Sequence, residues 1–490
     1  MSILNENKSM LPRSAYKLTP ELIARFAKIV GDKNAIITPA DQAPYLVEKS
    51  RYAYSVISPA VLRPSSVAEV SAIVKLANET STPIVPQGGN TGLTGGQIPH
   101  NGEIVLSLQR LDKIREIDPT SNTMTCEAGV TLRRAREAAA SVGRLYPLLL
   151  PSEGSCTIGG NLATNAGGIQ ALSYGVARNQ MLGLEVVLAD GRILNSLNKL
   201  KKDNTGYDLR NLFIGSEGTL GVITAAVLRL IPSLHSVETA FVGVPSPENA
   251  LKLLGVATER AGDAVTSFEM LTRMCIDSVL NNMVGCREPM KSRHQWYLVI
   301  ELSSQKATGL REVMEEILST GYELGLVADA VIADSIEQTK AFWGIREIAG
   351  EAQRREGGVI GHDISVSVVS VPAFLREADE AVTSLMPGCR PMPFGHLGDG
   401  NIHYTVVQPV GADKDEFLAH GKEINDLVHG IVMSLGGSIS AEHGIGFSKR
   451  EYLSKIKEPV ALDLIRGFKN LLDPKGILNP GKVLYPPGDS

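Results

Sequence analysis

The chain is poor in cysteine and in aromatic residues, and these shortages narrow the kinds of protein it can be. Its five cysteines are odd in number and have no C-x-x-C spacing, which indicates neither a disulfide framework nor a thiolate metal site. Aromatic residues make up 5% of the chain and the formal net charge is −5. Because neither stacking platforms nor a basic surface is indicated, we expect no nucleic-acid partner.

Long apolar runs are also missing. No segment approaches the roughly 18 apolar residues that span a bilayer, and the N-terminal MSILNENKSMLPRSAYKL lacks the apolar core of a secretory signal. A cytoplasmic protein without a transmembrane segment is the simplest expectation, while peripheral docking on a membrane and a homodimer are left open. The length of 490 residues suggests two or three domains.

Helical and strand patterns alternate through the first half of the chain. Ser66 and Glu69 form a capping-box pair ahead of apolar residues at helical spacing, which predicts a helix over residues 67–80. A brief strand at 83–86 follows. We also expect a short helical preface within 20–60, strands at 103–108 and 225–231, and a helix at 131–142. This alternation favours an α+β or α/β class.

A change in composition near residues 232–236 marks a domain boundary. Beyond it, the pattern predicts a sheet with helices on one face. The expected strands are 239–244, 296–302 and 327–332, and the expected helices are 247–261 and 310–324. A last helix is expected at 461–472. The predicted domains are 1–232, 233–440 and a C-terminal segment, 441–490, that returns to the first domain.

Three glycine-dense segments lie within the first domain. They are PQGGNTGLTGG at 86–96, PSEGSCTIGGNLATNAGGIQALSYG at 151–175, and IGSEGTLGVIT at 214–224. Glycine-rich backbone can form a concave nest of N–H groups that binds an oxyanion. The alternative for any single segment is a flexible surface loop. The spacing is not G-x-G-x-x-G, so a Rossmann dinucleotide site is not indicated, and the three together suggest an extended ligand.

Three of the nine histidines fall in two short glycine-rich segments. FGHLGDGNIHY contains His396 and His403, and SAEHGIG contains His443 beside Glu442. Two histidines and a carboxylate are enough protein ligands for Zn²⁺ or a similar cation. On the strand expected from residue 401, His403 and Thr405 point to the same side. A hydrogen-bonded structural histidine is the alternative for each one.

With these motifs in order, the chain from about residue 50 to 485 resembles the vanillyl-alcohol-oxidase superfamily, whose flavin domain is also called PCMH-type. Within it, the chain is most similar to the FAD-linked D-2-hydroxyacid dehydrogenases, a group that includes D-lactate dehydrogenase, the glycolate oxidase D subunit and D-2-hydroxyglutarate dehydrogenase. The resemblance implies an α+β fold, in which a PCMH-type FAD-binding domain of two α+β subdomains carries a cap domain with an antiparallel sheet covered by helices.

The resemblance also implies an FAD site. It assigns the first glycine segment, residues 86–96, to the pyrophosphate, and this segment is called the phosphate loop below. The second segment is assigned to the ribityl chain and isoalloxazine, and the third to the adenine end. The residues so assigned are Pro86, Gln87, Gly88, Gly89, Asn90, Thr91, Gly92, Gly95, Gly96, Pro151, Ser155, Ile158, Gly159, Gly160, Asn161, Thr164, Asn165, Gly168, Gly175, Gly221, Val222, Ile223 and Asn479. The phosphate loop contains no histidine, so we expect non-covalent FAD.

For the chemistry, the resemblance implies that His396, His403 and Glu442 bind a divalent metal such as Zn²⁺. It likewise implies that His443 is the catalytic base and that Arg346 holds the substrate carboxylate through a bidentate guanidinium. It also implies that Thr405 and His443 contact the substrate. A solvated surface arginine is the alternative for Arg346.

The chain departs from the family pattern at three substrate-side positions. Relatives commonly carry Thr, Lys and Asn where this chain has Gly350, Gly361 and Thr405. The identity of the substrate is therefore more open than the type of reaction.

We expect the flavin-dependent oxidation of a D-2-hydroxy acid, such as D-lactate or D-2-hydroxyglutarate, to the 2-oxo acid. Hydride would pass to flavin N5 while the metal binds the carboxylate and hydroxyl oxygens and His443 takes the hydroxyl proton. The electron acceptor could be a quinone, a cytochrome, an electron-transfer flavoprotein or dioxygen. Two rival functions are a metal-dependent hydrolase and a non-catalytic flavoprotein subunit of an electron-transfer complex.

Overall fold

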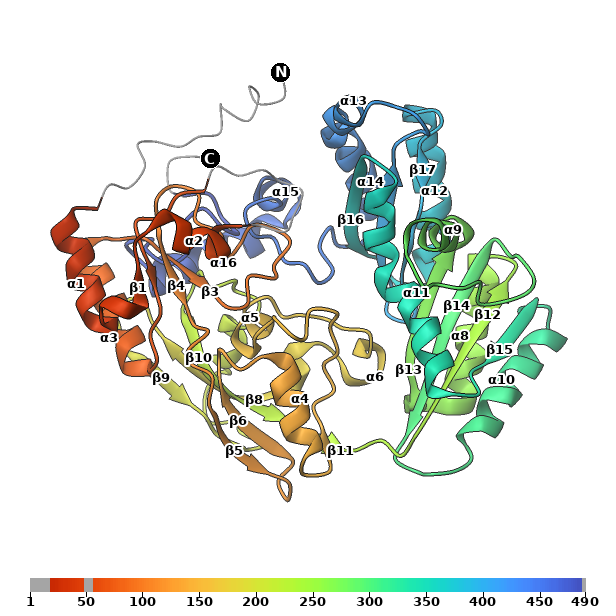
Figure 1. Ribbon diagram of the computed structural model, residues 1–490, viewed down its shortest axis with the longest axis horizontal. Helices are drawn as coiled ribbons and strands as arrows, with labels where there is room; N and C mark the ends of the chain where they lie inside the picture. The colour runs from red at the N-terminus through yellow and green to blue at the C-terminus, as the bar shows by residue number, and fades with distance from the viewer. Residues whose placement is uncertain (1–17, 48–55, 487–490) are drawn as a thin grey trace. The chain divides into compact units, whose positions relative to one another are not determined.

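The computed structural model describes residues 18–47 and 56–486, and the chain forms two compact units (Figure 1). The terminal unit contains the described residues up to 168, then 176–233 and 442–486. The central unit contains 169–175 and 234–441. Part of the expected helical preface, residues 48–55, lies outside the described residues.

The terminal unit begins with a four-stranded sheet of order β1-β2-β4-β3, in which β2, β4 and β3 are parallel. The strands are β1 (Ala35–Ile36), β2 (Val61–Leu62), β3 (Ile84–Gln87) and β4 (Ile104–Ser107), and the helices are α1 (Pro20–Val30), α2 (Pro39–Leu46) and α3 (Val67–Thr80). Apolar residues of α1, α3 and the strands form one core.

Helix α3 has the bounds that the sequence predicted. Ser66 Oγ accepts a hydrogen bond from Glu69 N at 3.2 Å. In a capping box the glutamate side chain also accepts a hydrogen bond from the backbone N–H of the capping residue. Here the preceding residue makes that bond, since Ser65 N donates to Glu69 Oε2 at 2.7 Å. Val70, Ile73 and Val74 are fully buried, so the predicted apolar face of the helix is the face in the core.

A second sheet of the terminal unit is antiparallel, with order β5-β6-β10-β8-β9. Its strands are β5 (Ile114–Asp118), β6 (Thr123–Glu127), β8 (Met181–Val187), β9 (Ile193–Ser196) and β10 (Val222–Arg229). A further pair is β7 (Arg144–Leu145) with β11 (Ile231–Pro232), and the helices are α4 (Leu132–Ala140), α5 (Ile158–Ala163), α7 (Arg210–Phe213), α15 (Arg450–Ile456) and α16 (Pro459–Leu472).

Helix α16 exposes much of its apolar surface. Leu462 is its one buried residue, while Leu464 is 58% and Leu471 75% exposed. The helix itself was predicted over 461–472, but the apolar spacing that predicted it does not coincide with a buried face.

The central unit is built on one large antiparallel sheet of order β15-β12-β14-β13-β18-β19-β16, with β17 beside β19 (Figure 1). The strands are β12 (Ser236–Val244), β13 (Val265–Thr272), β14 (Trp296–Ser304), β15 (Asp329–Ile332), β16 (Val359–Ser365), β17 (Arg390–Pro391), β18 (Phe394–His396) and β19 (Asn401–Val407). The helices are α6 (Ala171–Tyr174), α8 (Pro247–Ala261), α9 (Arg273–Asn282), α10 (Leu310–Glu323), α11 (Ile336–Arg355), α12 (Val371–Leu385), α13 (Lys414–Ala419) and α14 (Gly421–Ser434).

Helices cover both faces of this sheet, so the expectation of helices on one face is wrong. Helices α9 and α11 pack on the face that carries Tyr297 and Val299. Leu298 and Ile300 point to the opposite face and are also fully buried, where α8 and α10 lie against the strands. The reason is that these strands are apolar on both sides, and a strand of that kind needs two covering layers.

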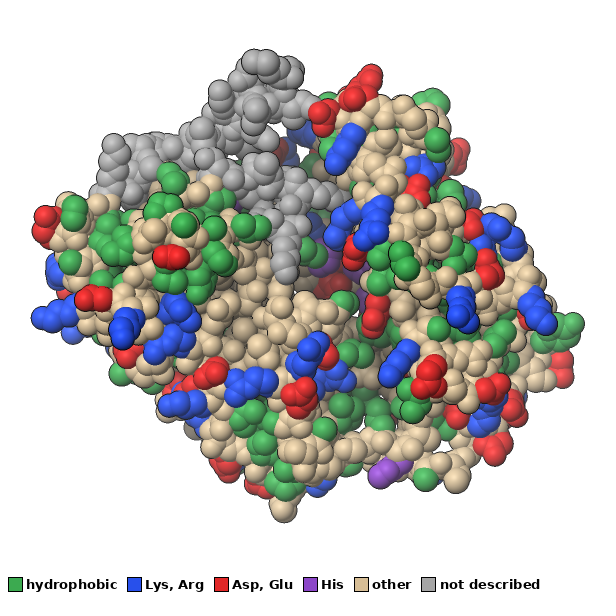
Figure 2. All heavy atoms as spheres, viewed as in Figure 1, with side chains coloured by type: hydrophobic (Ala, Val, Ile, Leu, Met, Phe, Trp, Pro, Cys, Tyr) green, Lys and Arg blue, Asp and Glu red, His purple; other side chains and the backbone are tan. Residues whose placement is uncertain are grey.

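The described part of the chain contains no helix that is both long and apolar enough to cross a membrane. Figure 2 shows Lys and Arg side chains interspersed with Asp and Glu over the viewed face.

Candidate functional site

The three glycine-dense segments of the terminal unit come together. The phosphate loop leaves the end of β3 and lies against the segment before α5: a Cβ at Gly88 would overlap Thr157 Oγ1, and one at Gly89 would overlap the carbonyl of Ser155. Only glycine permits so close an approach of two backbones. The first two segments therefore lie directly against each other.

The third segment joins the second through backbone hydrogen bonds. Gly215 N donates to Leu162 O at 3.0 Å and Glu217 N to Ala163 O at 2.8 Å. Asn479 from the C-terminal segment adds bonds from its Nδ2 to Gly96 O at 2.8 Å and to Glu217 O at 2.7 Å. Asn479, predicted only through the resemblance, therefore ties the first and third segments together.

Unsatisfied polar atoms fit a bound dinucleotide here. Gln87 Oε1, Asn90 Oδ1 and Asn479 Oδ1 are buried and have no hydrogen-bond partner among the residues that the structure describes. Buried polar atoms usually have partners, since leaving one unpaired costs about 1–3 kcal/mol. All three are acceptor oxygens of residues assigned to FAD, so they suit its hydroxyl and N–H donors rather than its pyrophosphate oxygens.

The remaining residues predicted to bind FAD lie on the same unit with one exception. Ile158, Gly159 and Gly160 form the first turn of α5, and Val222 and Ile223 begin β10. Gly175 ends α6 with φ +72° and belongs to the central unit.

The predicted metal histidines of the central unit lie on adjacent strands. His396 ends β18 and His403 is the third residue of β19, with ring centroids 5.5 Å apart. Ile402, Tyr404 and Val406 are fully buried on one side of β19, and His403 and Thr405 share the other, as the alternation predicts.

Arg346 and His396 are held by a buried carboxylate that sequence reasoning missed. Glu269 on β13 accepts from Arg346 Nε at 2.6 Å through Oε2 and contacts His396 Nδ1 at 2.7 Å through Oε1. Burial raises the pKa of Glu269, but Arg346 and His396 outweigh it and bring that pKa to about 2. The available signal was a single acidic residue inside the apolar strand sequence VTSFEMLT.

This arrangement decides how Arg346 can meet a ligand. Arg346 is only 6% exposed; Glu269 occupies its Nε, and its Nη2 lies 3.3 Å from His396 Nε2. The face that remains for a carboxylate is therefore the Nη1 and Nη2 end of the guanidinium, not the Nε edge.

Asp363 is a second acidic group beside the histidines. It lies opposite His403 in the β16–β19 register, with Oδ1 3.9 Å from His403 Nδ1. The carbonyl of Asp363 accepts a hydrogen bond from Ala441 N at 3.3 Å. Glu442 follows Ala441 in the chain, and its Oε1 is 3.9 Å from His443 Nε2.

The three positions that depart from the family pattern lie near Arg346 or on the strands that carry Asp363 and His403. Gly350 follows Arg346 by one turn of α11, and a Cβ there would be in ordinary contact with Phe394, 3.6 Å away. Gly361 and Thr405 are cross-strand partners. Because the β16–β19 register also pairs Asp363 with His403, Gly361 and Thr405 are on the same side of the strands as that pair.

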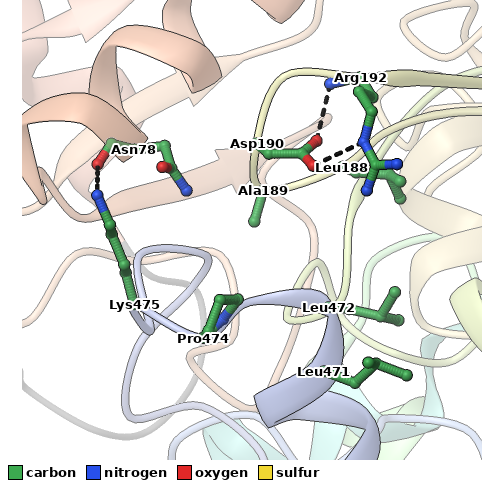
Figure 3. A pocket seen from close by; sticks show the side chains of 9 residues that line it. All are labelled: Asn78, Leu188, Ala189, Asp190, Arg192, Leu471, Leu472, Pro474 and Lys475. Atoms are coloured by element: carbon green, nitrogen blue, oxygen red, sulfur yellow. Dashed lines mark hydrogen bonds and ion pairs between the residues drawn. The ribbon is translucent and has the colours of Figure 1, made fainter.

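A surface cavity of about 210 Å³ lies elsewhere on the terminal unit, between α3, the turn after β8 and the end of α16 (Figure 3). The two basic side chains that line it already have partners. Arg192 Nε donates to Asp190 at 2.7 Å, and Lys475 Nζ donates to Asn78 O at 2.7 Å. None of the predicted site residues lines it.

Two family models match the chain. One, described as FAD linked oxidases, C-terminal domain, matches residues 234–483, and one described as FAD binding domain matches residues 58–196.

Curated relatives match over most of their length. The mitochondrial D-2-hydroxyglutarate dehydrogenase of Arabidopsis thaliana is 38% identical over 462 residues, which cover 94% of this chain and 81% of the relative. The D-2-hydroxyglutarate dehydrogenase of Stutzerimonas stutzeri is 34% identical, with 95% of this chain and 99% of the relative covered. Other relatives from plants and animals are also named as mitochondrial, so a cytoplasmic location stays a prediction.

Solved structures share the fold at low identity. p-Cresol methylhydroxylase superimposes with a TM-score of 0.77 at 16% identity, covering 96% of this chain and 99% of that one. Alkyldihydroxyacetonephosphate synthase gives a TM-score of 0.72 at 18% identity, covering 96% and 87%. At these identities the likeness concerns the fold alone.

Proposed function

Because the chain belongs to the FAD-linked D-2-hydroxyacid dehydrogenases, flavoproteins that oxidise a CH–OH donor, we propose that it oxidises a D-2-hydroxy acid with a divalent cation and with His443 as the base. The proposal depends above all on one observation, the placement of His403, Asp363, His396 and Arg346 on one side of the central sheet. When bound, FAD supplies the electron sink that no side chain offers.

The chemistry of each side chain suggests a different role in this reaction. The Nη1 and Nη2 end of Arg346 would hold the substrate carboxylate, and this fixes which face of C2 is presented. His403 and Glu442, with Asp363 as an additional donor, have the imidazole and carboxylate groups that suit Zn²⁺. His396 would join them once its Nε2, which now lies 3.3 Å from Arg346 Nη2, turns to the cation. A cation held there would lower the pKa of the substrate hydroxyl, so that the imidazole of His443 is an adequate base.

The substrate belongs to the 2-hydroxy acids, and D-2-hydroxyglutarate is a candidate because relatives carry that name. D-Lactate is the second candidate, since Gly350, Gly361 and Thr405 offer no charge for a distal carboxylate. A quinone, a cytochrome or an electron-transfer flavoprotein would then reoxidise the flavin.

The test is anaerobic bleaching of the flavin by D- and L-2-hydroxy acids, including both candidates, with and without a chelator. We expect bleaching by a D-acid only, slowed by the chelator. His443→Ala should retain FAD and slow bleaching by about 100-fold or more, the usual contribution of a general base. His420→Ala is the matched control, because His420 is a half-exposed histidine paired with Glu423.

Other outcomes identify the rivals. Colourless protein that binds no FAD would favour the hydrolase. Yellow protein that no 2-hydroxy acid bleaches would favour the non-catalytic subunit. Wild-type bleaching by His443→Ala would reject His443 as the base.

A further inference from the structure

The side chain of the acidic residue in the third glycine segment, Glu217 in IGSEGTLGVIT, has no role in the site described so far. It is 8% exposed and has φ +52°, a conformation that residues other than glycine seldom adopt. Such a conformation persists only where surrounding interactions impose it, and an observed outlier is a reason to look for a function. The contacts of the Glu217 side chain indicate which function this is.

The carboxylate of Glu217 binds the segment that carries His443. Oε1 accepts a hydrogen bond from Ile445 N at 2.7 Å, and Oε2 accepts one from Gly446 N at 2.8 Å. Each oxygen therefore binds one of two successive peptide groups, two and three residues beyond His443. Hydrogen bonds from backbone N–H to a carboxylate are stronger than those between neutral groups.

Little space surrounds this carboxylate. A Cβ at Gly444 would stand 2.9 Å from Glu217 Oε1, and one at Gly96 would stand 3.1 Å from Oε2. Burial raises the pKa of Glu217 to about 7, and the two N–H donors and Lys449 oppose that rise. Such a costly burial is understandable if the carboxylate holds a segment in place.

The same segment is bound to the phosphate loop. Thr94 Oγ1 donates to His443 O at 3.3 Å, while Phe447 N donates to Thr94 O at 2.8 Å. Val483 N donates to Gly446 O at 2.8 Å from the C-terminal segment. All of these residues belong to the terminal unit. Among these contacts, the two bonds to Glu217 are the ones that involve an ionisable side chain.

We propose that Glu217 is a positioning residue that holds residues 443–446 against the flavin-binding loops and thereby fixes the place of the His443 imidazole. This proposal rests on the proposed function, in which His443 is the base. Catalytic rates fall steeply with small misplacements, by about 100-fold for 1 Å. Glu217 itself need not contact the substrate or the flavin to produce that effect.

The test compares the full-length FAD-loaded Glu217→Gln variant with wild type. The amide keeps one accepting oxygen, but its NH₂ group faces an N–H donor, so one of the two bonds is lost. Glu127→Gln is the matched control, because Glu127 is a buried carboxylate of the same unit that accepts from Lys113 N at 3.0 Å. Thermal unfolding and FAD content establish that each variant is folded and loaded.

Two measurements then decide the proposal. Hydrogen exchange at the amides of Ile445 and Gly446 should be faster by about tenfold or more in Glu217→Gln. Anaerobic flavin reduction by the best D-2-hydroxy acid should slow by about 10- to 100-fold at saturating substrate, with the half-saturating concentration changed by less than about threefold. Glu127→Gln should match wild type in both.

Unchanged hydrogen exchange at the amides of Ile445 and Gly446 would overturn the claim that Glu217 holds this segment in place. Faster exchange with flavin reduction at the wild-type rate would overturn the positioning role. Should Glu217→Gln not fold, Glu217→Asp replaces it, since the shorter side chain keeps the charge but withdraws both oxygens, and the same outcomes apply. His443→Ala is measured in parallel: if it reduces flavin normally, the base assignment fails, while the exchange experiment still reports on Glu217.

Discussion

The ion pair between Glu269 and Arg346 shows how a single residue changes the interpretation of its neighbour. The sequence favoured Arg346 as a carboxylate-binding arginine, but it gave no reason to place Glu269 within 2.6 Å of it. Both side chains are buried, and each partner makes the burial of the other tolerable. Glu269 therefore orients Arg346 and His396 together.

Replacing Glu269 with Gln should leave a buried, unpaired Arg346. We expect the free energy of unfolding at pH 7 to fall by about 3–5 kcal/mol, the usual cost of breaking a buried ion pair. Because the folded-state pKa of Glu269 is lowered to about 2, its contribution is present above the ordinary pKa near 4.5 and is lost as the pH falls towards 2. Urea unfolding at several pH values measures this difference.

Glu301→Gln is the control for that experiment. Glu301 is a buried carboxylate on β14 that accepts from the neutral Trp343 Nε1 at 2.8 Å, and burial raises its pKa. Its contribution to stability is therefore lost as the pH rises, so the two variants should show opposite trends with pH. The same trend in both would contradict the ion-pair explanation for Glu269.

Among the elements, α3 follows from local sequence because its cap and its apolar face agree with each other. Helix α16 has the same kind of apolar spacing, yet only Leu462 is buried. The central sheet gives a similar lesson: β12, β14, β15 and β19 were recognisable, but β13 and the helices on the second face were not expected. Periodicity identifies an element, whereas the surface that covers it depends on segments far away in the sequence.

The cap of α3 gives a prediction at this scale. Ser66→Ala removes the acceptor for Glu69 N and should lower the free energy of unfolding by about 1 kcal/mol. Thr38→Ala is the matched control, because Thr38 precedes α2 without a side-chain capping bond. Chemical denaturation of both variants measures the difference, and an equal loss in the two would show that the Ser66 bond contributes nothing.

At the scale of the whole molecule, cofactor binding and stability are coupled through the terminal unit. Its glycine segments leave buried polar atoms without a partner among the described residues, so FAD should stabilise the folded state by mass action. At a free FAD concentration of about 100 times Kd, the gain should be about 2.7 kcal/mol. Flavin fluorescence during heating follows the release of FAD, and FMN, which lacks the adenylate half, is the control ligand.

Both tryptophans, Trp296 and Trp343, are in the central unit, so their fluorescence reports on that unit. A midpoint of heat-induced FAD release that does not rise with added FAD would contradict the coupling, whereas the tryptophan signal shows whether the central unit is stabilised as well. A rise produced equally by FMN would show that the adenylate half contributes no stabilisation.

The sequence by itself determined the fold class, the FAD-linked family and several individual elements, α3 among them. These depend on local patterns, because glycine crowding, capping residues and apolar spacing constrain the backbone directly. The sequence also identified His403 and Thr405 as sharing one side of a strand, since alternation on a strand is a local property.

Only the tertiary structure decided which charged groups stand beside the predicted site residues. Glu269 is 77 residues from Arg346, and Glu217 is 228 residues from Ile445. Single acidic residues in an apolar strand or a glycine loop are visible in a sequence, but their partners are not. Hydrogen bonds and ion pairs over such separations exist only after the chain has folded, and here they determine how Arg346 is presented and what holds the segment of His443.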